Sequence, residues 1–468
     1  MRTGVSGGTS KQRSTSFNDE RSINMFPVVD PRGKDGVAMY GRPGNLLLAT
    51  AGSGPGRGAY TASNGRAFFV SGNALYEYDG SPTGVLRGTL GTNTGLLVTM
   101  DENGTQLAVC DGNKLYIFTY ATNAFAQVVT ANLPSASTVT FIGGYFVVSR
   151  VNSGIFQISA LYDGFTWGAL DFATAESSPD SLLCVKNIAG QLALVGTKST
   201  EFYSNTGARF PFQRINGAVI STGTVSAYSV LQLDNSMFLV SRDDNGAGIV
   251  YRLQGFSPRR ISTEPIELLI QAAPTPATLR SWSYQEDGHT FFVLTGGGMM
   301  TTLVYDLATG VWHERAFLNQ YGNYEPDISA CGTYAFNKII TIDRQSGNIY
   351  EQSLKYNSDN GSEIAADRIF TTIQEEDKPI IIKNLTVGIE TGLGTQTGQG
   401  YDPQLILYVS KDGGKTWSAG RSKSAGKAGE YNKRVKFDRL GQARQFMFRL
   451  RMTDPSARYI SGAWINTI

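Results

Sequence analysis

The sequence predicts an all-β protein, a β-propeller of about six to seven blades followed by a C-terminal β-sandwich. The main observation is a hairpin that recurs seven times, with an apolar strand, a Gly/Asn/Asp turn and a second strand built around Tyr or Phe. The copies lie roughly 40 to 55 residues apart, a spacing typical of propellers and other repeat arrays. They occupy residues 67–79, 106–120, 145–159, 191–205, 237–253, 290–307 and 338–354.

Composition supports the same fold class. The 54 glycines suit many tight turns, and the 41% hydrophobic residues are enough for a large core. No segment of about 12 residues or more has clean amphipathic helical spacing, although a short helix is expected at residues 265–273. No apolar segment approaches the roughly 18 residues that span a membrane, and the N-terminus lacks an apolar signal region. We therefore expect the protein to be made and kept in a cytosol.

Residues 1–44 are expected to form an N-terminal arm and a turn-rich lead-in. Residues 1–25 are rich in Ser, Gly, Arg and Lys and lack periodicity, so alone they are expected to be disordered. A neighbouring molecule could order them as an arm.

Residues 45–366 are the predicted propeller. The apolar run LLLAT at residues 46–50 is a candidate for the strand that closes the ring. Segments between the hairpins, such as residues 138–144 and 181–190, are also strand-like, which permits four strands per blade.

Residues 367–468 are predicted to form a separate β-sandwich, because the Tyr-rich hairpin stops there. Alternating apolar and polar residues predict half-buried antiparallel strands in this part of the chain. The predicted strands lie within residues 380–390, 405–413, 434–440 and 445–453.

The C-terminal part is basic, whereas the rest of the chain is mildly acidic. Residues 403–468 carry 13 Lys and Arg against 4 Asp and Glu. Alternation in KRVKF predicts Lys433 and Val435 on one strand face and Arg434 and Lys436 on the other, with Tyr431 and Phe437 interleaved. Docking on an acidic protein, contact with nucleic acid and a merely solvated face all remain open. The candidate basic residues are Arg421, Lys423, Lys427, Lys433, Arg434, Lys436 and Arg439.

One motif fits the Asp-box spacing S-x-D-x-G-x-T-W. Its residues are Ser410, Asp412, Gly414, Thr416 and Trp417. We expect a structural hairpin turn in which the aspartate accepts backbone N–H groups, the glycine takes positive φ and the tryptophan packs beneath. The motif resembles the boxes of sialidases and other propellers. Sialidases carry several copies, an arginine triad and a Tyr nucleophile, and these have no assignable counterparts here.

Other residues argue against catalysis and cofactors. The scarcity of histidine (His289 and His313) lowers the expectation of a zinc site or a Ser-His-Asp triad, and the three dispersed cysteines are expected to be small buried thiols. The adjacent acids at residues 375–377 are expected in a turn and not across a catalytic cleft. The run at residues 243–246 favours a hairpin turn over a calcium loop. We predict no catalytic, cofactor-binding or metal-binding residue.

Three segments carry a resemblance to a known family. They are INMFPVV (23–29) with YGRPG (40–44), KSTEFYSNTG (198–207), and the C-terminal run at residues 433–465, in which a Lys-Arg-Val strand, an Arg-Leu-Gly turn and a Phe-x-Leu-Arg strand follow in order. The chain resembles the tail accessory proteins of short-tailed bacteriophages, also known as packaged-DNA stabilisation or tail hub (nozzle) proteins. The resemblance covers nearly the whole chain.

The resemblance implies a structural virion protein. Six copies would form a ring below the portal and adaptor, extend the DNA channel, stabilise packaged double-stranded DNA and take part in genome ejection. The ring would present the tail needle or plug and the tailspike or fibre proteins, and would assemble in the host cytoplasm. A carbohydrate-active, sialidase-like tail enzyme and a cellular propeller interaction module are the alternatives.

Overall fold

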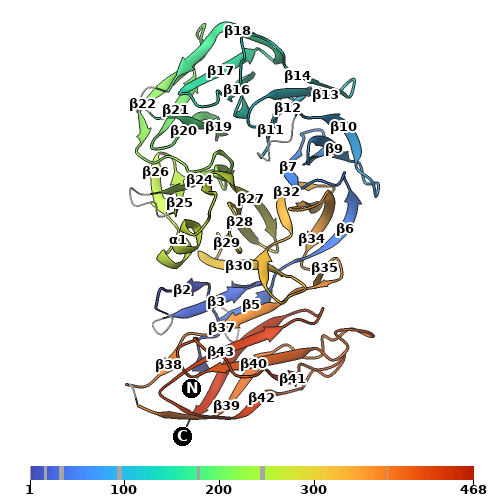
Figure 1. The fold of residues 1–468 in the computed structure, drawn as a ribbon, viewed down its shortest axis with the longest axis vertical. Coiled ribbons are helices and arrows are strands. Elements are labelled where there is room, and N and C mark those ends of the chain that lie inside the picture. The colour runs from blue at the N-terminus through green and yellow to red at the C-terminus, as the bar shows by residue number, and fades with distance from the viewer. Residues whose placement is uncertain are drawn as a thin grey trace.

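Seven four-stranded blades surround a common centre and form the propeller (Figure 1). Five of the blades are separate sheets, and two continue into larger sheets. The computed structural model describes residues 2–14, 18–30, 36–91, 97–175, 180–242, 248–376 and 378–467. The predicted propeller is confirmed, and its described strands make seven blades. The first blade consists of β7 (Gly56–Thr61), β8 (Ala67–Ser71), β9 (Ala74–Tyr78) and β10 (Val85–Thr89), and the second of β11 (Thr99–Glu102), β12 (Gln106–Cys110), β13 (Leu115–Thr119) and β14 (Ala124–Gln127). The third consists of β15 (Thr138–Ile142), β16 (Tyr145–Ser149), β17 (Ile155–Ala160) and β18 (Asp163–Thr174). The fourth consists of β19 (Leu182–Ile188), β20 (Gln191–Gly196), β21 (Thr200–Asn205) and β22 (Phe212–Ile220).

The last three blades follow the same plan. They are β23 (Leu231–Leu233), β24 (Ser236–Arg242), β25 (Gly248–Gln254) and β26 (Ser257–Arg260); β27 (Leu279–Glu286), β28 (His289–Gly296), β29 (Thr302–Asp306) and β30 (Val311–Leu318); and β32 (Ser329–Ala335), β33 (Lys338–Asp343), β34 (Asn348–Ser353) and β6 (Gly44–Thr50). Short elements between them are η1 (Ala227–Ser229), η2 (Pro276–Thr278) and β31 (Tyr324–Pro326).

The recurrent hairpin is the second and third strand of each blade. These strands are buried on both faces, because neighbouring blades pack against them, so apolar residues run through them. All five residues of β8 are buried, whereas every residue of the outer strand β26 is exposed. Aromatic rings join adjacent blades: the Phe68 and Phe118 centroids lie 5.3 Å apart, and those of Phe238 and Phe292 lie 5.2 Å apart.

The ring is closed by a strand from the N-terminal part of the chain. Strand β6 pairs antiparallel with β34 as the outer strand of the last blade. This confirms the prediction for residues 46–50. Closure of this kind joins the first blade to the last and removes the open sheet edges between them.

One helix lies beside the fifth blade. Helix α1 (Glu264–Gln271) confirms the helix expected at residues 265–273 and has Pro265 in its first turn. Ile266 and Ile270 are buried and anchor it. No helix among the described residues is long and apolar enough to cross a membrane.

Two further sheets face each other and form the predicted β-sandwich. One has the order β4-β5-β44-β39-β42, with β1 on β44. The other continues the sheet of the sixth blade from β30 in the order β3-β37-β43-β40-β41, with β2 on β3 and β38 on β43. Side chains of both sheets, including Leu385, Leu407, Phe437 and Leu450, share one buried core. The bounds are β1 (Arg2–Thr3), β2 (Ser10–Lys11), β3 (Asp19–Ile23), β4 (Met25–Val29), β5 (Val37–Gly41), β37 (Ala366–Ile369), β38 (Ile373–Gln374), β39 (Ile380–Ile389), β40 (Gln404–Ser410), β41 (Arg421–Ser424), β42 (Val435–Ala443), β43 (Gln445–Met452) and β44 (Tyr459–Thr467), with the small hairpin β35 (Ser358–Asp359) and β36 (Ser362–Glu363) preceding β37.

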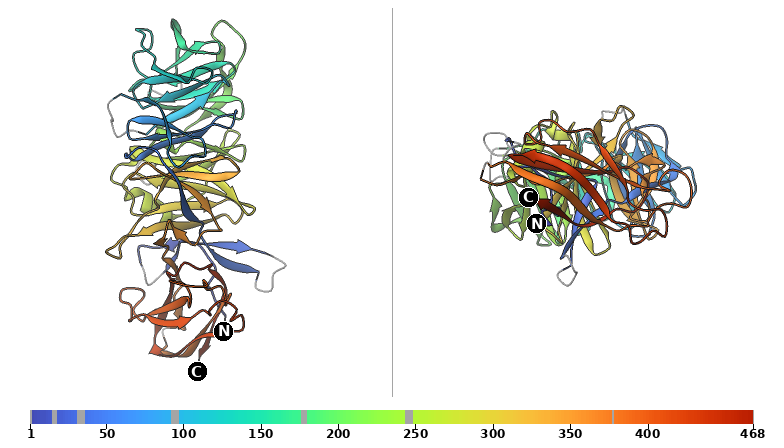
Figure 2. Two further views of the ribbon diagram at one scale, coloured as in Figure 1. Left: turned by 90° about the vertical axis from the view of Figure 1, so that its right-hand side faces the viewer. Right: turned by 90° about the horizontal axis from the view of Figure 1, so that it is seen from below.

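The N-terminal strands belong to the sandwich sheets. The expectation of disorder in residues 1–25 is wrong for the described residues 2–14 and 18–25, because they pair with the chain's own C-terminal strands and bury Val5, Ile23 and Met25. The chain therefore begins in the sandwich, builds the propeller and returns. Figure 2 shows the two units stacked along the long axis, with both termini at the sandwich end. The division at residues 45 and 367 remains a prediction.

Candidate functional site

The predicted basic residues gather along one open edge of the sandwich. Strand β41 carries Arg421 and Lys423 at the end of one sheet, and β42 carries Lys436 and Arg439 at the end of the other (Figure 1). Arg421 joins the two strands, because its Nη2 donates to the Asp438 carbonyl oxygen at 2.6 Å. Lys427, Lys433 and Arg434 lie in the connection between the strands. We call these seven residues the basic edge.

Local carboxylates neutralise only part of the basic edge. Lys433 pairs with Glu430 at 3.0 Å, and Lys436 pairs with Asp438 at 2.8 Å. The hydrogen bond from Lys436 lowers the pKa of the Asp438 carboxyl. Lys427 lies over the Tyr401 ring, 4.8 Å from its centroid. The remaining members of the basic edge form no ion pair with a carboxylate of the described residues. These members are Arg421, Lys423, Arg434 and Arg439.

The predicted alternation in KRVKF is wrong for Lys433. Strand β42 begins at Val435, so Lys433 lies before the strand and is exposed, whereas Val435 is buried. Phe437 is also buried in the sandwich core and does not interleave with the cations at the surface. Tyr431 is 72% exposed and faces solvent, as does Tyr401 beneath Lys427.

The Asp-box residues form a turn between β40 and β41. Ser410 Oγ donates to Asp412 Oδ1 at 2.7 Å, and Thr416 donates its N–H to Asp412 Oδ1 at 2.9 Å and its hydroxyl to Oδ2 at 2.6 Å. The Thr416 hydroxyl is the main cause that lowers the pKa of Asp412. Gly414 has φ +85°, and Trp417 is half-buried in a groove with Val409 and Leu440. The turn therefore precedes β41 and fixes the direction in which the chain enters this strand, which carries Arg421 and Lys423.

The other sequence candidates do not assemble into a site. Glu376 pairs with Lys378 at 2.8 Å in an exposed turn, and Asp377 lies outside the described residues, as do residues 243–247. Cys110 and Cys184 are buried, whereas Cys331 is partly exposed. Within the described ranges, no group of three or more His, Cys, Asp or Glu is placed to hold a metal ion.

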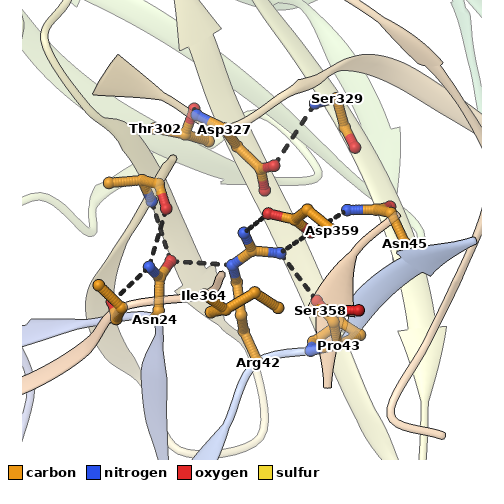
Figure 3. A network of polar contacts seen from close by, with 12 residues as sticks. Asn24, Arg42, Pro43, Asn45, Thr302, Asp327, Ser329, Ser358, Asp359 and Ile364 are labelled. Carbon is orange, nitrogen blue, oxygen red and sulfur yellow. Dashed lines mark hydrogen bonds and ion pairs between the residues drawn. The ribbon is translucent and has the colours of Figure 1, made fainter. Parts of the chain in front are cut away.

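The most elaborate polar arrangement lies between the propeller and the sandwich (Figure 3). Arg42 Nη2 lies 2.5 Å from Asp359 Oδ2, and Nη1 lies 3.1 Å from Oδ1. Arg42 Nε donates to Asn24 Oδ1 at 2.9 Å, and Asn24 Nδ2 donates to the carbonyl oxygens of Ala316 and Ala365, both at 2.8 Å. Asn24 therefore links β30 of the propeller to the chain that leads into β37 of the sandwich.

Further ion pairs extend this junction. Asp367 accepts hydrogen bonds from Arg449, Arg451 and Tyr324 at 2.5 to 2.8 Å. Burial alone would raise the pKa of Asp367, but Arg451 and Arg449 outweigh burial and lower it. Glu314 of β30 pairs with Arg21 of β3 at 2.6 Å, next to the parallel pairing of Ile23 with Glu314. Propeller and sandwich are thus joined by buried, hydrogen-bonded charges.

Sequence reasoning missed the role of this junction but did single out some of its residues. Asn24 lies in INMFPVV and Arg42 in YGRPG, two of the segments that carry the family resemblance. Arg449 and Arg451 lie in the third, C-terminal segment. Their partners Asp359 and Asp367 lie far away in sequence, so no local pattern could have paired them.

The same two units are matched by models of one protein family. The model described as Bacteriophage P22 Gp10, beta-propeller, matches residues 1–354. The model described as Bacteriophage P22 Gp10, beta-sandwich, matches residues 368–467. The chain belongs to the Bacteriophage P22 Gp10 family. The P22 Gp10 family consists of structural phage tail proteins, so this chain has a structural role in a phage tail, as a tail hub or nozzle component of a virion assembled with other phage proteins.

Other comparisons add nothing to the P22 Gp10 match. No curated protein matches the chain. One similar solved structure is the extracellular domain of a putative one-component system from B. thetaiotaomicron, with 10% identity over 80% of this chain and 47% of that chain and a TM-score of 0.44. A second is the Cps50 (Swd1) beta-propeller domain of Myceliophteria thermophila, with 10% identity over 66% of this chain and 99% of that chain and a TM-score of 0.42. A third is the N-terminal domain of Nup159, with 11% identity over 71% of this chain and 98% of that chain and a TM-score of 0.39. The chain spans about half of the first of these, 47% of its length.

Proposed function

We propose that six copies of this chain form a ring below the portal and adaptor of a short-tailed phage and extend its DNA channel. The ring holds packaged DNA, passes it during ejection, and presents the needle or plug and the spike or fibre proteins. It performs no catalysis, and it assembles in the host cytoplasm. The observation that carries this proposal is the match of both P22 Gp10 models, in order, to residues 1–354 and 368–467.

The junction supports a role as a rigid building block. A ring closes through heterologous contacts, in which one surface of each copy meets a different surface of the next. Such closure requires a fixed angle between the two units of the chain. The buried pair of Arg42 and Asp359 and the Asp367 cluster hold that angle.

We assign the basic edge to docking on an acidic surface of the adaptor ring. Its cations lie on the outermost strands of both sandwich sheets and in the connection between them, and charge at a sheet edge also discourages unwanted strand pairing. A docking partner of opposite charge would increase the rate of encounter and fix the orientation of the ring. Contact with channel DNA is the competing outcome.

Ring formation predicts a change of mass on mixing. The purified chain is expected to be a monomer alone and to add as six copies to a purified portal–adaptor complex, as measured by native mass spectrometry. A chain that stays monomeric beside the adaptor would contradict the ring and leave the fold and family unaffected.

Removal of unpaired charge from the basic edge is expected to weaken docking. The triple variant Lys423→Gln, Arg434→Gln, Arg439→Gln should lose about tenfold in adaptor affinity at low salt, since each exposed ion pair contributes roughly 0.2–1 kcal/mol. Affinity and its salt dependence can be measured by surface plasmon resonance. The matched control changes three exposed propeller cations, Lys198, Arg209 and Lys355, to Gln. Equal losses in both variants would contradict the assignment. If the chain instead binds duplex DNA, and the slope of log affinity against log salt concentration falls by about 0.9 for each lost phosphate contact, DNA and not the adaptor is the partner of the basic edge.

A further inference from the structure

A cavity of about 390 Å³ lies at the centre of the propeller. The innermost strand of every blade contributes to its wall, namely β7, β11, β15, β19, β23, β27 and β32. Part of the wall is apolar and includes Val98, Met100, Val139 and Trp282. Charges inside such a wall interact more strongly than charges in water, because few water dipoles screen them.

The charged residues of this cavity are mostly cationic. Arg57, Lys186 and Arg280 line it, from the first, fourth and sixth blades, and Asp101 is the carboxylate among the described lining residues. The Asp101 carboxylate already accepts hydrogen bonds from neighbouring residues of the propeller. It accepts hydrogen bonds from the Tyr60 hydroxyl at 3.3 Å, the Thr140 hydroxyl at 2.9 Å and the Phe141 N–H at 2.7 Å.

Hydrogen bonds between the inner strands place the three cations at a similar height. Val98 N donates to the Arg57 carbonyl oxygen, and Val139 N donates to Thr99 Oγ1, both at 3.1 Å. Val185, which precedes Lys186, donates to Thr138 Oγ1 at 3.0 Å. Corresponding residues of neighbouring inner strands therefore lie at similar positions along the propeller axis. Along this axis, Arg57 and Lys186 are offset by about one residue.

Arg280 reaches the same level from the sixth blade. Its Nη1 donates to the carbonyl oxygen of Gly56, the residue before Arg57, at 2.9 Å. Its Nε is enclosed and has no hydrogen-bond partner among the described residues. The guanidinium therefore has one unpaired donor, although this nitrogen is itself enclosed by the protein.

The titratable group that acts most strongly on Arg280, the Cys331 thiol, is not an effective counter-charge. Cys331 lies beside the guanidinium, and burial raises the pKa of the Cys331 thiol to about 11, although Arg280 opposes this rise. The thiol is therefore neutral near pH 7. Some enclosed guanidiniums of the chain face carboxylates, as Arg42 faces Asp359, whereas Arg315 and Arg458 contact only a hydroxyl or carbonyl oxygens. Arg280 is partly buried, and a guanidinium that lacks a counter-charge in such a place carries an energetic cost. An anion bound beside it would reduce that cost.

We propose that the centre of the propeller binds a small oxyanion of the phosphate class, with Arg280 as its main ligand and Lys186 and Arg57 supplying further positive charge. A guanidinium offers a planar fork of donors that matches phosphate oxygens, and Lys186 adds a mobile point charge. The anion would tie the first, fourth and sixth blades together across the cavity. This site is independent of the ring and of the basic edge.

The test is a titration of the full-length protein with inorganic phosphate in chloride buffer of matched ionic strength. Isothermal titration calorimetry measures the binding. One saturable site per chain is expected, together with a rise of the thermal unfolding midpoint as phosphate increases. Arg280→Gln should weaken the affinity about tenfold or more, because a hydrogen bond to a charged group is lost. Arg209→Gln, which removes an exposed cation of the propeller, should bind as the wild type does.

A second variant keeps the proposal testable if loss of the Arg280–Gly56 hydrogen bond disturbs folding. Lys186→Gln removes charge from the cavity without removing that bond, and it should weaken phosphate binding while circular dichroism stays unchanged. Absence of saturable binding to the folded wild type, or equal binding by wild type, Arg280→Gln and Lys186→Gln, would overturn the proposal.

Discussion

Replacing Asp359 with Asn is expected to lower the free energy of unfolding by about 3–5 kcal/mol, because the variant leaves a buried guanidinium without its counter-charge. Arg42 and Asp359 are 2% and 3% exposed, so water cannot take over the lost interactions. The remaining hydrogen-bond partners of Arg42 are the neutral oxygens of Asn24 and Pro43, and Asp327 acts on Arg42 only through its more distant charge. Urea unfolding followed by circular dichroism measures the loss.

An exposed ion pair of the same chain provides the matched control. The Lys378 and Glu376 side chains are 70% and 79% exposed and lie 2.8 Å apart. Lys378→Gln should therefore change the free energy of unfolding by less than about 1 kcal/mol. The double variant Arg42→Met, Asp359→Leu should recover part of the stability lost in Asp359→Asn, since two apolar residues leave no charge unpaired. Equal effects of Asp359→Asn and Lys378→Gln would show that the junction does not stabilise the chain.

The propeller could be predicted because its strongest pattern is local. Both strands of the recurrent hairpin are enclosed by neighbouring blades, so they are apolar and are separated by a short turn, as β8 and β9 are. The closing strand was recognisable as an apolar run just before the first repeat. Outer strands such as β14 are mostly exposed, and their composition does not distinguish them from loops.

The sandwich could be predicted only in part, because distant partners stabilise several of its strands. Polar residues at the N-terminus form β1 only by pairing with β44, as Arg2 does with Trp464. The faces of β42 depend on where the strand begins, and this start at Val435 lies two residues later than Lys433. The junction is the extreme case, since Arg42 and Asp359 are separated by 317 residues. Local propensity carries no information about such a pair.

The second large effect is a loss of stability in acid that comes from His313. This residue of β30 is 0% exposed, and neither ring nitrogen has a hydrogen-bond partner among the described residues. The rings of Phe26 and Phe291 lie 5.8 and 5.9 Å from its own ring. Burial, with a smaller contribution from the charge of His289, lowers the pKa of His313 from 6.5 to about 3. The imidazole is thus neutral in the folded chain at neutral pH.

The sign of the effect follows from proton uptake. As the pH falls below about 6.5, the unfolded chain binds a proton at this position while the folded chain does not, so unfolding becomes easier. The loss grows until about pH 3, where the folded chain also binds the proton. At about 1.4 kcal/mol per pH unit, the contribution of His313 to the loss is about 5 kcal/mol.

Replacement of His313 with Leu, which cannot bind a proton, should remove this part of the acid sensitivity. The free energy of unfolding of His313→Leu is therefore expected to fall less steeply than that of the wild type between pH 6.5 and about pH 3. His289→Gln is the control, because it keeps the buried imidazole of His313 and removes only the smaller contribution of His289, which is partly exposed and contacts Asp306 at 2.8 Å. Parallel decreases in the wild type and His313→Leu would mean that carboxylates alone, and not the enclosed histidine beside Phe26, make this junction sensitive to acid.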